Sequence, residues 1–330
     1  MVTVAVVGAG AFGRNHARVY QNLAKQGEPL RLAGIVDIDI SRADALAREF
    51  GCRAFGSVDQ LISTYNEVQA ASVAVPTVHH LSVARSLMQA GVDVLIEKPL
   101  TPSLAEADEV IKLSRELNRI VQVGHLERFN PAVQATVDLV TQPMFFEVHR
   151  LSMFTPRSLD VDVVLDLMIH DLDIVLSFTK SPVKEIRAVG LPILSRKVDI
   201  ANVRLEFESG CVANFTASRV STEQVRKLRF FQPGQYVSLD YSRQDVLVFS
   251  VGGDNAGTPS ANPQIKINKP ELKAQEPLQA ELQSFLDCIR QRSKPLVSAE
   301  DGRSALKLAL DIVSTMAKHG EKVQLETLRR

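Results

Sequence analysis

The sequence predicts an α/β protein of two domains, the first built on a parallel sheet and the second on an antiparallel one. Up to about residue 123, nearly continuous apolar segments alternate with helical segments, as in a parallel sheet that is covered on both faces. Beyond that point strand-like segments follow one another without intervening helices, which favours antiparallel pairing. A length of 330 residues, 45% of them hydrophobic, suits two domains and a sizeable core.

Strands and helices alternate regularly through the first part of the chain. Glycines that follow helical segments, Gly51 and Gly91, mark where two of the helices stop. The predicted strands cover residues 2–7, 30–37, 70–76, 92–99 and 120–125. The predicted helices cover residues 13–24, 43–51, 79–91 and 103–118.

The second part has a different rhythm, and we place the domain boundary between residues 123 and 124. Residues 208–210 and 232–235 are predicted turns between hairpin partners, and residues 251–264 a Gly/Pro/Asn-rich loop. The final helical segments are expected either to stay with the second domain or to pack back on the first domain. The strand-like segments are 144–152, 183–194, 200–220 and 226–250, and the helical ones 130–140, 163–173, 279–292 and 299–320.

The bulk composition argues against several classes of protein. There are 38 basic and 38 acidic residues, so the chain lacks the basic surplus that nucleic-acid or anionic-membrane binding requires. No apolar run approaches a membrane span, and the first residues do not resemble a signal peptide. The three cysteines, Cys52, Cys211 and Cys288, are far apart and form no zinc pattern, which favours a reducing cytoplasm.

A glycine-rich turn follows the first strand in the segment GAGAFG. Gly8 permits the tight turn, Gly10 lets the backbone approach a pyrophosphate, and Gly13 lets helix and strand pack closely. The start of the helix then offers free N–H groups and a positive dipole end to phosphate. The strand–turn–helix setting identifies a Rossmann domain that binds a dinucleotide, with Ala11 and Phe12 also bordering it.

The second strand ends in an acidic residue, Asp37, at the distance where an adenosine ribose needs an acceptor. A carboxylate there repels a 2′-phosphate, and no arginine follows it directly. NAD is therefore predicted over NADP, although Arg42 lies near enough in sequence to keep NADP as the alternative.

Two further segments carry groups suited to chemistry. Glu97–Lys98–Pro99 ends a buried strand of the first domain, where open α/β sheets place their ligands, so the Lys98 ammonium can face a substrate oxygen. The segment VVLDLMIHDLD places Asp166 and His170 four residues apart, on one face of a helix. Asp173 shares that face, whereas Asp171 points elsewhere and is expected in solvent.

Taken in order, the segments GAGAFGRNHA, VAVPTVHH, EKPLT, GHLERFNPA and DLMIHDLD resemble the Gfo/Idh/MocA oxidoreductase family over essentially the whole chain. The resemblance implies a Rossmann domain, then an α/β domain with a large open antiparallel sheet through which the chains form homodimers or homotetramers. It also implies NAD(P)-dependent chemistry on sugars or polyols. Lys98, Asp166 and His170 match the family's substrate-site residues. Where many members have two glycines before the Asp, this chain has Val163 and Val164.

The segment Arg128–Pro131 resembles the subgroup that oxidises UDP-N-acetylated sugars at C3. Guanidinium groups bind phosphate in a bidentate way, so Arg128 and Arg157 are candidates for the diphosphate. UDP-N-acetylglucosamine or a related UDP-sugar is the expected substrate. An aminotransferase is then the implied next enzyme, towards an amino sugar of lipid A or another glycan.

Other positions are assigned by their place beside these motifs. Asn15 and His16 come just after the glycine turn, and this pair resembles one that is frequent at the same place in the family. Further candidate cofactor contacts are Pro76, Thr77, His79, Glu97 and Lys98. Further candidate substrate contacts are His16, His125 and Asn130.

Oxidation of a secondary alcohol removes a hydride from carbon and a proton from oxygen. His170 is the expected base, with Asp166 orienting its ring or binding a sugar hydroxyl, and Lys98 stabilising the charge that develops on the oxygen. Lys98 is the alternative base, if burial favours its neutral amine. No metal is expected, because hydride chemistry with nicotinamide needs none. The alternative functions are a dehydrogenase of a free sugar or inositol, and a non-catalytic nicotinamide-binding sensor.

Overall fold

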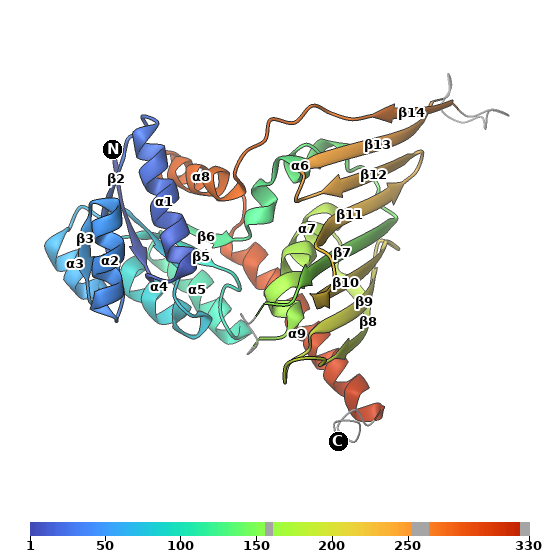
Figure 1. Ribbon diagram of the computed structural model, residues 1–330, viewed down its shortest axis with the longest axis horizontal. Helices are drawn as coiled ribbons and strands as arrows, with labels where there is room; N and C mark the ends of the chain where they lie inside the picture. The colour runs from blue at the N-terminus through green and yellow to red at the C-terminus, as the bar shows by residue number, and fades with distance from the viewer. Residues whose placement is uncertain (156–160, 253–263, 324–330) are drawn as a thin grey trace. The chain divides into compact units, whose positions relative to one another are not determined.

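The computed structural model describes residues 1–155, 161–252 and 264–323 (Figure 1). Contacts within the chain divide it into two compact units. Unit 1 comprises Met1–Phe129 and Gln275–Leu306, and unit 2 comprises Asn130–Ala274 and Lys307–Arg330. Unit 1 is therefore discontinuous in sequence, because a segment near the end of the chain joins the N-terminal residues. In the described residues, no helix has the length and apolar character needed to cross a membrane.

Unit 1 contains a six-stranded parallel sheet in the order β3-β2-β1-β4-β5-β6. This order reverses direction between β1 and β4, where dinucleotide-binding sheets place their ligand. The strands are β1 (Val2–Val7), β2 (Leu30–Val36), β3 (Arg53–Phe55), β4 (Ala70–Val73), β5 (Asp93–Glu97) and β6 (Val121–Gly124). The helices are α1 (Ala11–Lys25), α2 (Ile40–Phe50), α3 (Val58–Thr64), α4 (His80–Gln89), α5 (Leu104–Glu116) and α8 (Pro277–Gln291), with 3₁₀ turns η1 (Thr77–His79) and η2 (Leu126–Phe129).

Local sequence accounts for the ends of these elements. Every residue of β1 is buried, as expected for a strand with helices on both faces. Asp39 caps α2 by accepting hydrogen bonds from two backbone N–H groups, and Gly51 ends that helix in the left-handed conformation, with φ of 65°. Ser103 caps α5 and is followed three residues later by Glu106, as in a capping box.

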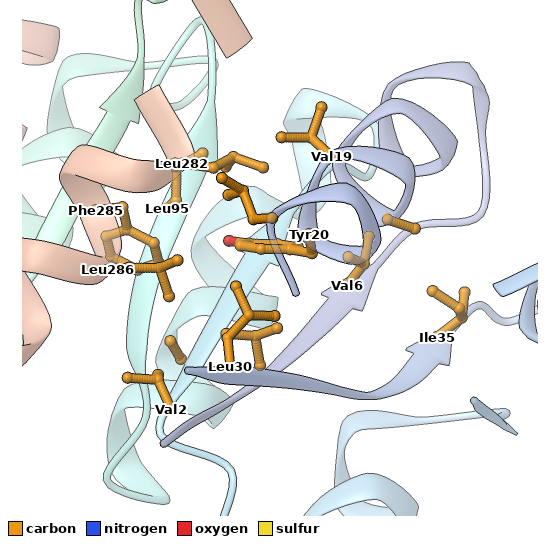
Figure 2. Packing of buried hydrophobic residues seen from close by; sticks show 14 of the residues in the cluster. Val2, Val6, Val19, Tyr20, Leu30, Ile35, Leu95, Leu282, Phe285 and Leu286 are labelled. Carbon is orange, nitrogen blue, oxygen red and sulfur yellow. The ribbon is translucent and has the colours of Figure 1, made fainter. Parts of the chain in front are cut away.

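The core of unit 1 joins segments that are far apart in sequence. Figure 2 shows Leu282, Phe285 and Leu286 of α8 beside Tyr20 of α1. The same cluster includes Val2 and other residues of the first two strands. Helix α8 therefore belongs structurally to the nucleotide-binding fold.

Unit 2 contains an eight-stranded sheet in the order β14-β13-β12-β11-β7-β10-β9-β8. All neighbouring pairs are antiparallel except β7 and β10, which are parallel. The strands are β7 (Phe145–Met153), β8 (Val183–Leu191), β9 (Ile200–Phe207), β10 (Val212–Ser221), β11 (Val225–Gln232), β12 (Gln235–Asp240), β13 (Asp245–Gly252) and β14 (Gln264–Asn268). The helical segments are α6 (Pro131–Gln134), η3 (Val137–Leu139), η4 (Val164–Met168), α7 (Ile169–Thr179) and α9 (Ala299–Lys322), the last of which starts in unit 1.

The predicted fold class is confirmed, and several elements differ in detail. Residues 130–140, predicted as one helix, form the short α6 and the 3₁₀ turn η3. The structure adds three elements that lack a clear periodic signal: β3, α3 and β14. The predicted turns at 208–210 and 232–235 are present, with Gly210 and Gly234 at positive φ.

Candidate active site

The glycine turn after β1 has the geometry that the sequence predicts for a dinucleotide. A Cβ on Gly13 would stand 1.7 Å from the carbonyl oxygen of Gly8, so only glycine allows this approach of helix to strand. Gly8 has φ of 105°, and a Cβ there would stand 2.4 Å from the carbonyl oxygen of Ala74. Gly10 faces open space, and no side chain caps α1 at this residue. The first N–H groups of α1 can therefore receive a pyrophosphate.

Asp37 lies directly beyond β2 and beside this turn. Its carboxylate accepts hydrogen bonds from the backbone N–H of Ala9 at 2.7 Å and of Asp39 at 2.9 Å. These bonds fix the carboxylate at the place where a ribose would need an acceptor. Arg42, the arginine that kept NADP as the alternative, forms an exposed ion pair with Asp39 at 3.1 Å.

Exposed apolar side chains surround this end of the sheet. Ile38, which follows Asp37, is 95% exposed, and Phe12 and Val78 are also exposed. Apolar side chains beside fixed polar groups are typical of cofactor sites. Phe12 was expected here from the sequence, whereas Ile38 and Val78 were not. An apolar residue directly after a strand end that carries the ribose acceptor is the signal that could have found Ile38.

The end of β4 is joined to the end of β5 by a histidine that the sequence analysis did not select. His80 is buried, with Nε2 at 3.0 Å from the carbonyl oxygen of Val75 and Nδ1 at 3.1 Å from the carbonyl oxygens of Pro99 and Leu100. Burial lowers the pKa of His80, against the opposing effect of these bonds. Among the predicted cofactor contacts nearby, Pro76 and His79 are exposed, and Thr77 is half-buried.

The side chain of Glu97 turns into the domain at the end of β5. Its Oε1 lies 2.9 Å from Nε2 of His16, and its Oε2 accepts a hydrogen bond from the backbone N–H of Lys98 at 3.2 Å. His16 is fully buried, and its Nδ1 lies 2.9 Å from Oγ of Ser72. Both ring nitrogens of His16 are thus engaged inside unit 1. Through these bonds Glu97 and His16 support the site from inside unit 1, and the direct cofactor and substrate contacts expected of them stay predictions.

Lys98 and His125 lie at the same edge of the sheet. Glu97 and Gly124 are paired in the register of β5 and β6, so the residues that follow them, Lys98 and His125, are neighbours at the carboxyl end. Lys98 is half-buried and His125 is buried. Arg128, in the turn η2 that begins after His125, is half-buried.

Unit 2 carries Asp166 and His170 on one continuous helical segment. The predicted helix is present, but Val164–Met168 form a π-helical turn before α7 begins at Ile169. A spacing of four keeps Asp166 and His170 on one side of the segment, and π-helical turns occur frequently at functional sites. Asp166 is half-buried and His170 is 8% exposed.

The departure from the family pattern at Val163 and Val164 has a simple structural explanation. Both valine side chains are fully buried, and Val163 has ordinary helical dihedral angles, with φ of −55°. No glycine conformation is needed at that residue, and the two side chains add to the core of unit 2.

Asp171 is not in solvent, contrary to the prediction. It is 1% exposed and forms a bidentate ion pair with Arg150 of β7, with N···O distances of 2.6 and 3.0 Å. The Arg150 guanidinium also lies over the ring of Tyr241, 5.1 Å from its centroid. Asp173 is buried as well. An i, i+3 or i+4 pattern cannot distinguish a solvent-facing acid from one that meets a buried arginine of another element.

Replacement of Asp171 by Ala should lower the free energy of unfolding by about 3–5 kcal/mol, because the charge of Arg150 would remain buried without this partner. Chemical denaturation followed by circular dichroism measures the change. The exposed Asp138 offers a control, since its replacement by Ala should change stability by less than about 0.5 kcal/mol. Equal stability of the two variants would contradict this account of Asp171.

Asn130 and Arg157 are the two remaining predicted substrate contacts. Asn130 is buried and caps α6 through a hydrogen bond from the N–H of Ala132, while its Nδ2 donates to the carbonyl oxygen of Tyr241 at 3.0 Å. These two bonds give Asn130 a structural role in unit 2, and its expected substrate contact stays a prediction. Arg157 lies outside the described residues. Within those residues, no group of three or more His, Cys, Asp or Glu side chains is arranged to hold a metal ion.

Comparison with known proteins identifies the family. Residues 2–125 match the Gfo/Idh/MocA family model that is described as an oxidoreductase family with an NAD-binding Rossmann fold. Residues 134–231 match the Gfo/Idh/MocA C-terminal domain. UDP-N-acetylglucosamine 3-dehydrogenase of Acidithiobacillus ferrooxidans is 38% identical over 308 residues, which cover 93% of this chain and 95% of that protein. The chain belongs to the Gfo/Idh/MocA oxidoreductase family.

Similarity to this family extends through both units. The solved structure of the Acidithiobacillus ferrooxidans enzyme has a TM-score of 0.86 at 36% identity, and the match covers 95% of this chain and 97% of that one. The scyllo-inositol 2-dehydrogenase (NAD(+)) of Bacillus subtilis is 25% identical, over 99% of this chain and 97% of that protein. This Gfo/Idh/MocA member is thus an oxidoreductase whose Rossmann domain binds NAD, as the glycine turn and Asp37 predicted.

Proposed function

We propose that the protein oxidises the C3 hydroxyl of UDP-N-acetylglucosamine, or of a related UDP-sugar, to the 3-keto sugar while NAD is reduced to NADH. The observation that carries the proposal is the 38% identity, over 93% of the chain, to an enzyme named for this reaction. Lys98, Asp166 and His170 supply the groups that such an oxidation needs.

His170 takes the proton from the sugar hydroxyl in this proposal. Asp166, on the same side of the helical segment, orients the imidazole or accepts a hydrogen bond from a second hydroxyl. Lys98 donates a hydrogen bond to the reacting oxygen and stabilises its developing negative charge. Bound NAD supplies the hydride acceptor, held by the glycine turn, the start of α1 and Asp37. Arg128 and Arg157 are the proposed diphosphate ligands, of which Arg157 lies outside the described residues.

Steady-state oxidation in the presence of NAD tests the substrate directly. UDP-N-acetylglucosamine should produce the absorbance of reduced nicotinamide, and free hexoses or inositols should not. Turnover of an inositol alone would replace the proposal with the activity named for the Bacillus subtilis relative. Binding of NAD without turnover of any of these compounds would favour a nicotinamide sensor.

The proposal includes assembly into a homodimer or homotetramer through the sheet of unit 2. Phe146 of β7 packs against Phe178 of α7, with centroids 6.4 Å apart, so Phe145 points to the opposite face of the sheet. On that face four aromatic rings form a row, with successive centroids 5.6, 4.8 and 5.3 Å apart. The rings belong to Phe145, Phe231, Tyr236 and Phe249. Such a row across four strands is suited to contact with a second sheet.

Replacement of Phe231 by Asp should convert the assembly to monomers at micromolar concentration, because it places a charge inside the proposed interface. Phe231 is 37% exposed in the single chain. Sedimentation velocity measures the oligomeric state, and Val137→Asp, at an exposed apolar residue of η3, is the control. A wild-type protein that sediments as a monomer at this concentration would exclude the proposed assembly.

The proposal also includes a cellular location and a class of enzyme that uses the product. A cytoplasmic location agrees with the three cysteines, Cys52, Cys211 and Cys288, all of which are free thiols. A 3-keto sugar carries a carbonyl that can accept an amino group, so an aminotransferase is the class of enzyme proposed to consume the product.

A further inference from the structure

A chain of four buried polar side chains lies behind Lys98 in unit 1. The hydroxyl of Tyr20 lies 2.9 Å from Oγ of Ser72, which lies 2.9 Å from Nδ1 of His16. Nε2 of His16 lies 2.9 Å from Oε1 of Glu97. Tyr20, Ser72 and His16 are fully buried, and they come from α1 and β4, while Glu97 ends β5.

The direction of the bond between His16 and Glu97 follows from the chemistry of the carboxylate. A carboxylate only accepts, so Nε2 of His16 carries a hydrogen and donates a hydrogen bond to Glu97. Nδ1 of His16 forms a second hydrogen bond with Oγ of Ser72, and Ser72 Oγ forms a third with the hydroxyl of Tyr20. The other oxygen of Glu97 accepts from the backbone N–H of Lys98. Glu97 thereby connects helix α1 to the lysine at the strand end.

Glu97 carries the negative charge of this cluster. Burial raises the pKa of Glu97, but the hydrogen bond and charge of His16, together with the charge and N–H of Lys98, outweigh burial and lower it. The other titratable groups facing Glu97 are His80 of α4 and Glu281 of α8. Burial, and then the charge of Glu97, raise the pKa of Glu281 well above its usual value.

The order Ser72–His16–Glu97 matches that of a nucleophile, its base and an acid in hydrolases. Ser72 is 0% exposed within β4, so no substrate can reach its hydroxyl. A hydrolytic role is therefore excluded for this chain of side chains.

We propose that His16 is a positioning residue for the oxidation, because through Glu97 it fixes the backbone of Lys98 and maintains a negative charge beside the ammonium. The inference rests on the proposed function, which assigns Lys98 to the reacting oxygen. Neither His16 nor Glu97 contacts substrate in this account. They hold Lys98 where its hydrogen bond stabilises the developing alkoxide.

Two replacements of His16 separate its two bonds. The amide of Gln extends about as far as Nε2 and can donate to Glu97, whereas the shorter amide of Asn extends to Ser72 and leaves Glu97 without this donor. We expect His16→Gln to retain most of the kcat for UDP-N-acetylglucosamine. His16→Asn should lower kcat by about 10-fold to 100-fold with an unchanged KM for NAD.

The pH profile gives a readout that a purely structural role would not change. Without the His16 donor, burial of Glu97 is less opposed and the pKa of Glu97 rises. The acidic limb of kcat, which the proposed base His170 sets in the wild type, should therefore gain a contribution from Glu97 and move to higher pH in His16→Asn, and it should stay in place in His16→Gln. Glu97→Gln, which removes the charge and preserves the shape, should lower kcat similarly and serves if His16→Asn does not fold.

Tyr20→Phe is the matched control, since it removes the far end of the same buried chain without changing the bond to Glu97. It should lower the melting temperature and leave kcat and its pH profile as in the wild type. Equal losses of kcat in Tyr20→Phe and His16→Asn, with an unmoved acidic limb, would reduce His16 to a packing residue. If Lys98→Met abolishes turnover and His16→Asn does not affect it, this inference alone fails. A Lys98→Met variant with normal turnover would contradict both the proposed role of Lys98 and the inference on His16.

Discussion

His170→Asn should lower kcat for UDP-N-acetylglucosamine by about 10²-fold to 10⁴-fold, the contribution of a positioned base to a proton transfer. Asparagine preserves the approximate size and polarity of the side chain but cannot accept and release the proton. NAD should bind as in the wild type, because the glycine turn and Asp37 are in unit 1 and His170 is in unit 2. Reduced-nicotinamide absorbance measures turnover, and fluorescence quenching measures binding of the cofactor.

The matched control for this variant is Asp166→Asn, which removes the proposed orienting carboxylate and preserves the imidazole. It should have a smaller effect on kcat than His170→Asn. Undiminished turnover in His170→Asn would remove His170 from the mechanism and favour Lys98 as the base.

Lys98→Met should lower kcat by about 10²-fold to 10³-fold, the usual effect of removing one donor to a developing oxyanion. Methionine retains the length and apolar body of the side chain, so the half-buried site at the end of β5 stays filled. Lys98→Arg is informative beside it, since the guanidinium retains the charge but not the compact geometry of the ammonium.

The two residues are distinguished by their dependence on pH. If His170 is the base, Lys98→Met should retain the acidic limb of the wild-type kcat profile at reduced amplitude. Loss of that limb in Lys98→Met, and its retention in His170→Asn, would exchange the roles of the two side chains.

Periodicity and turn residues were sufficient to predict both sheets and most of their strands. The apolar runs of β1 and β4, alternating with helical segments, indicated buried parallel strands, and Gly8 and Gly13 identified the nucleotide turn between strand and helix. The same reasoning missed β14, whose five residues directly follow a segment rich in Gly, Pro and Asn. Short edge strands depend on their neighbour for pairing, and a single sequence carries little trace of that neighbour.

Side-chain partners in other elements were the main limit of the sequence analysis at the site. His16 is placed correctly after the glycine turn, but its bonds to Ser72 and Glu97 span 56 and 81 residues. Asp171 was expected in solvent because its buried partner, Arg150, is on a different element. Local patterns show which face of a helix a residue occupies. They do not show which charged group lies on the element that packs against that face.

The late position of α8 in the chain has a consequence for biosynthesis. Leu282, Phe285 and Leu286 complete a core whose other members include Val2 and Tyr20, so the first 129 residues leave the ribosome with part of their apolar surface uncovered. The nucleotide-binding unit can finish folding only after nearly the whole of unit 2 has been translated. Until then its exposed surface is open to chaperones, and a fragment that stops at residue 129 would keep that surface permanently.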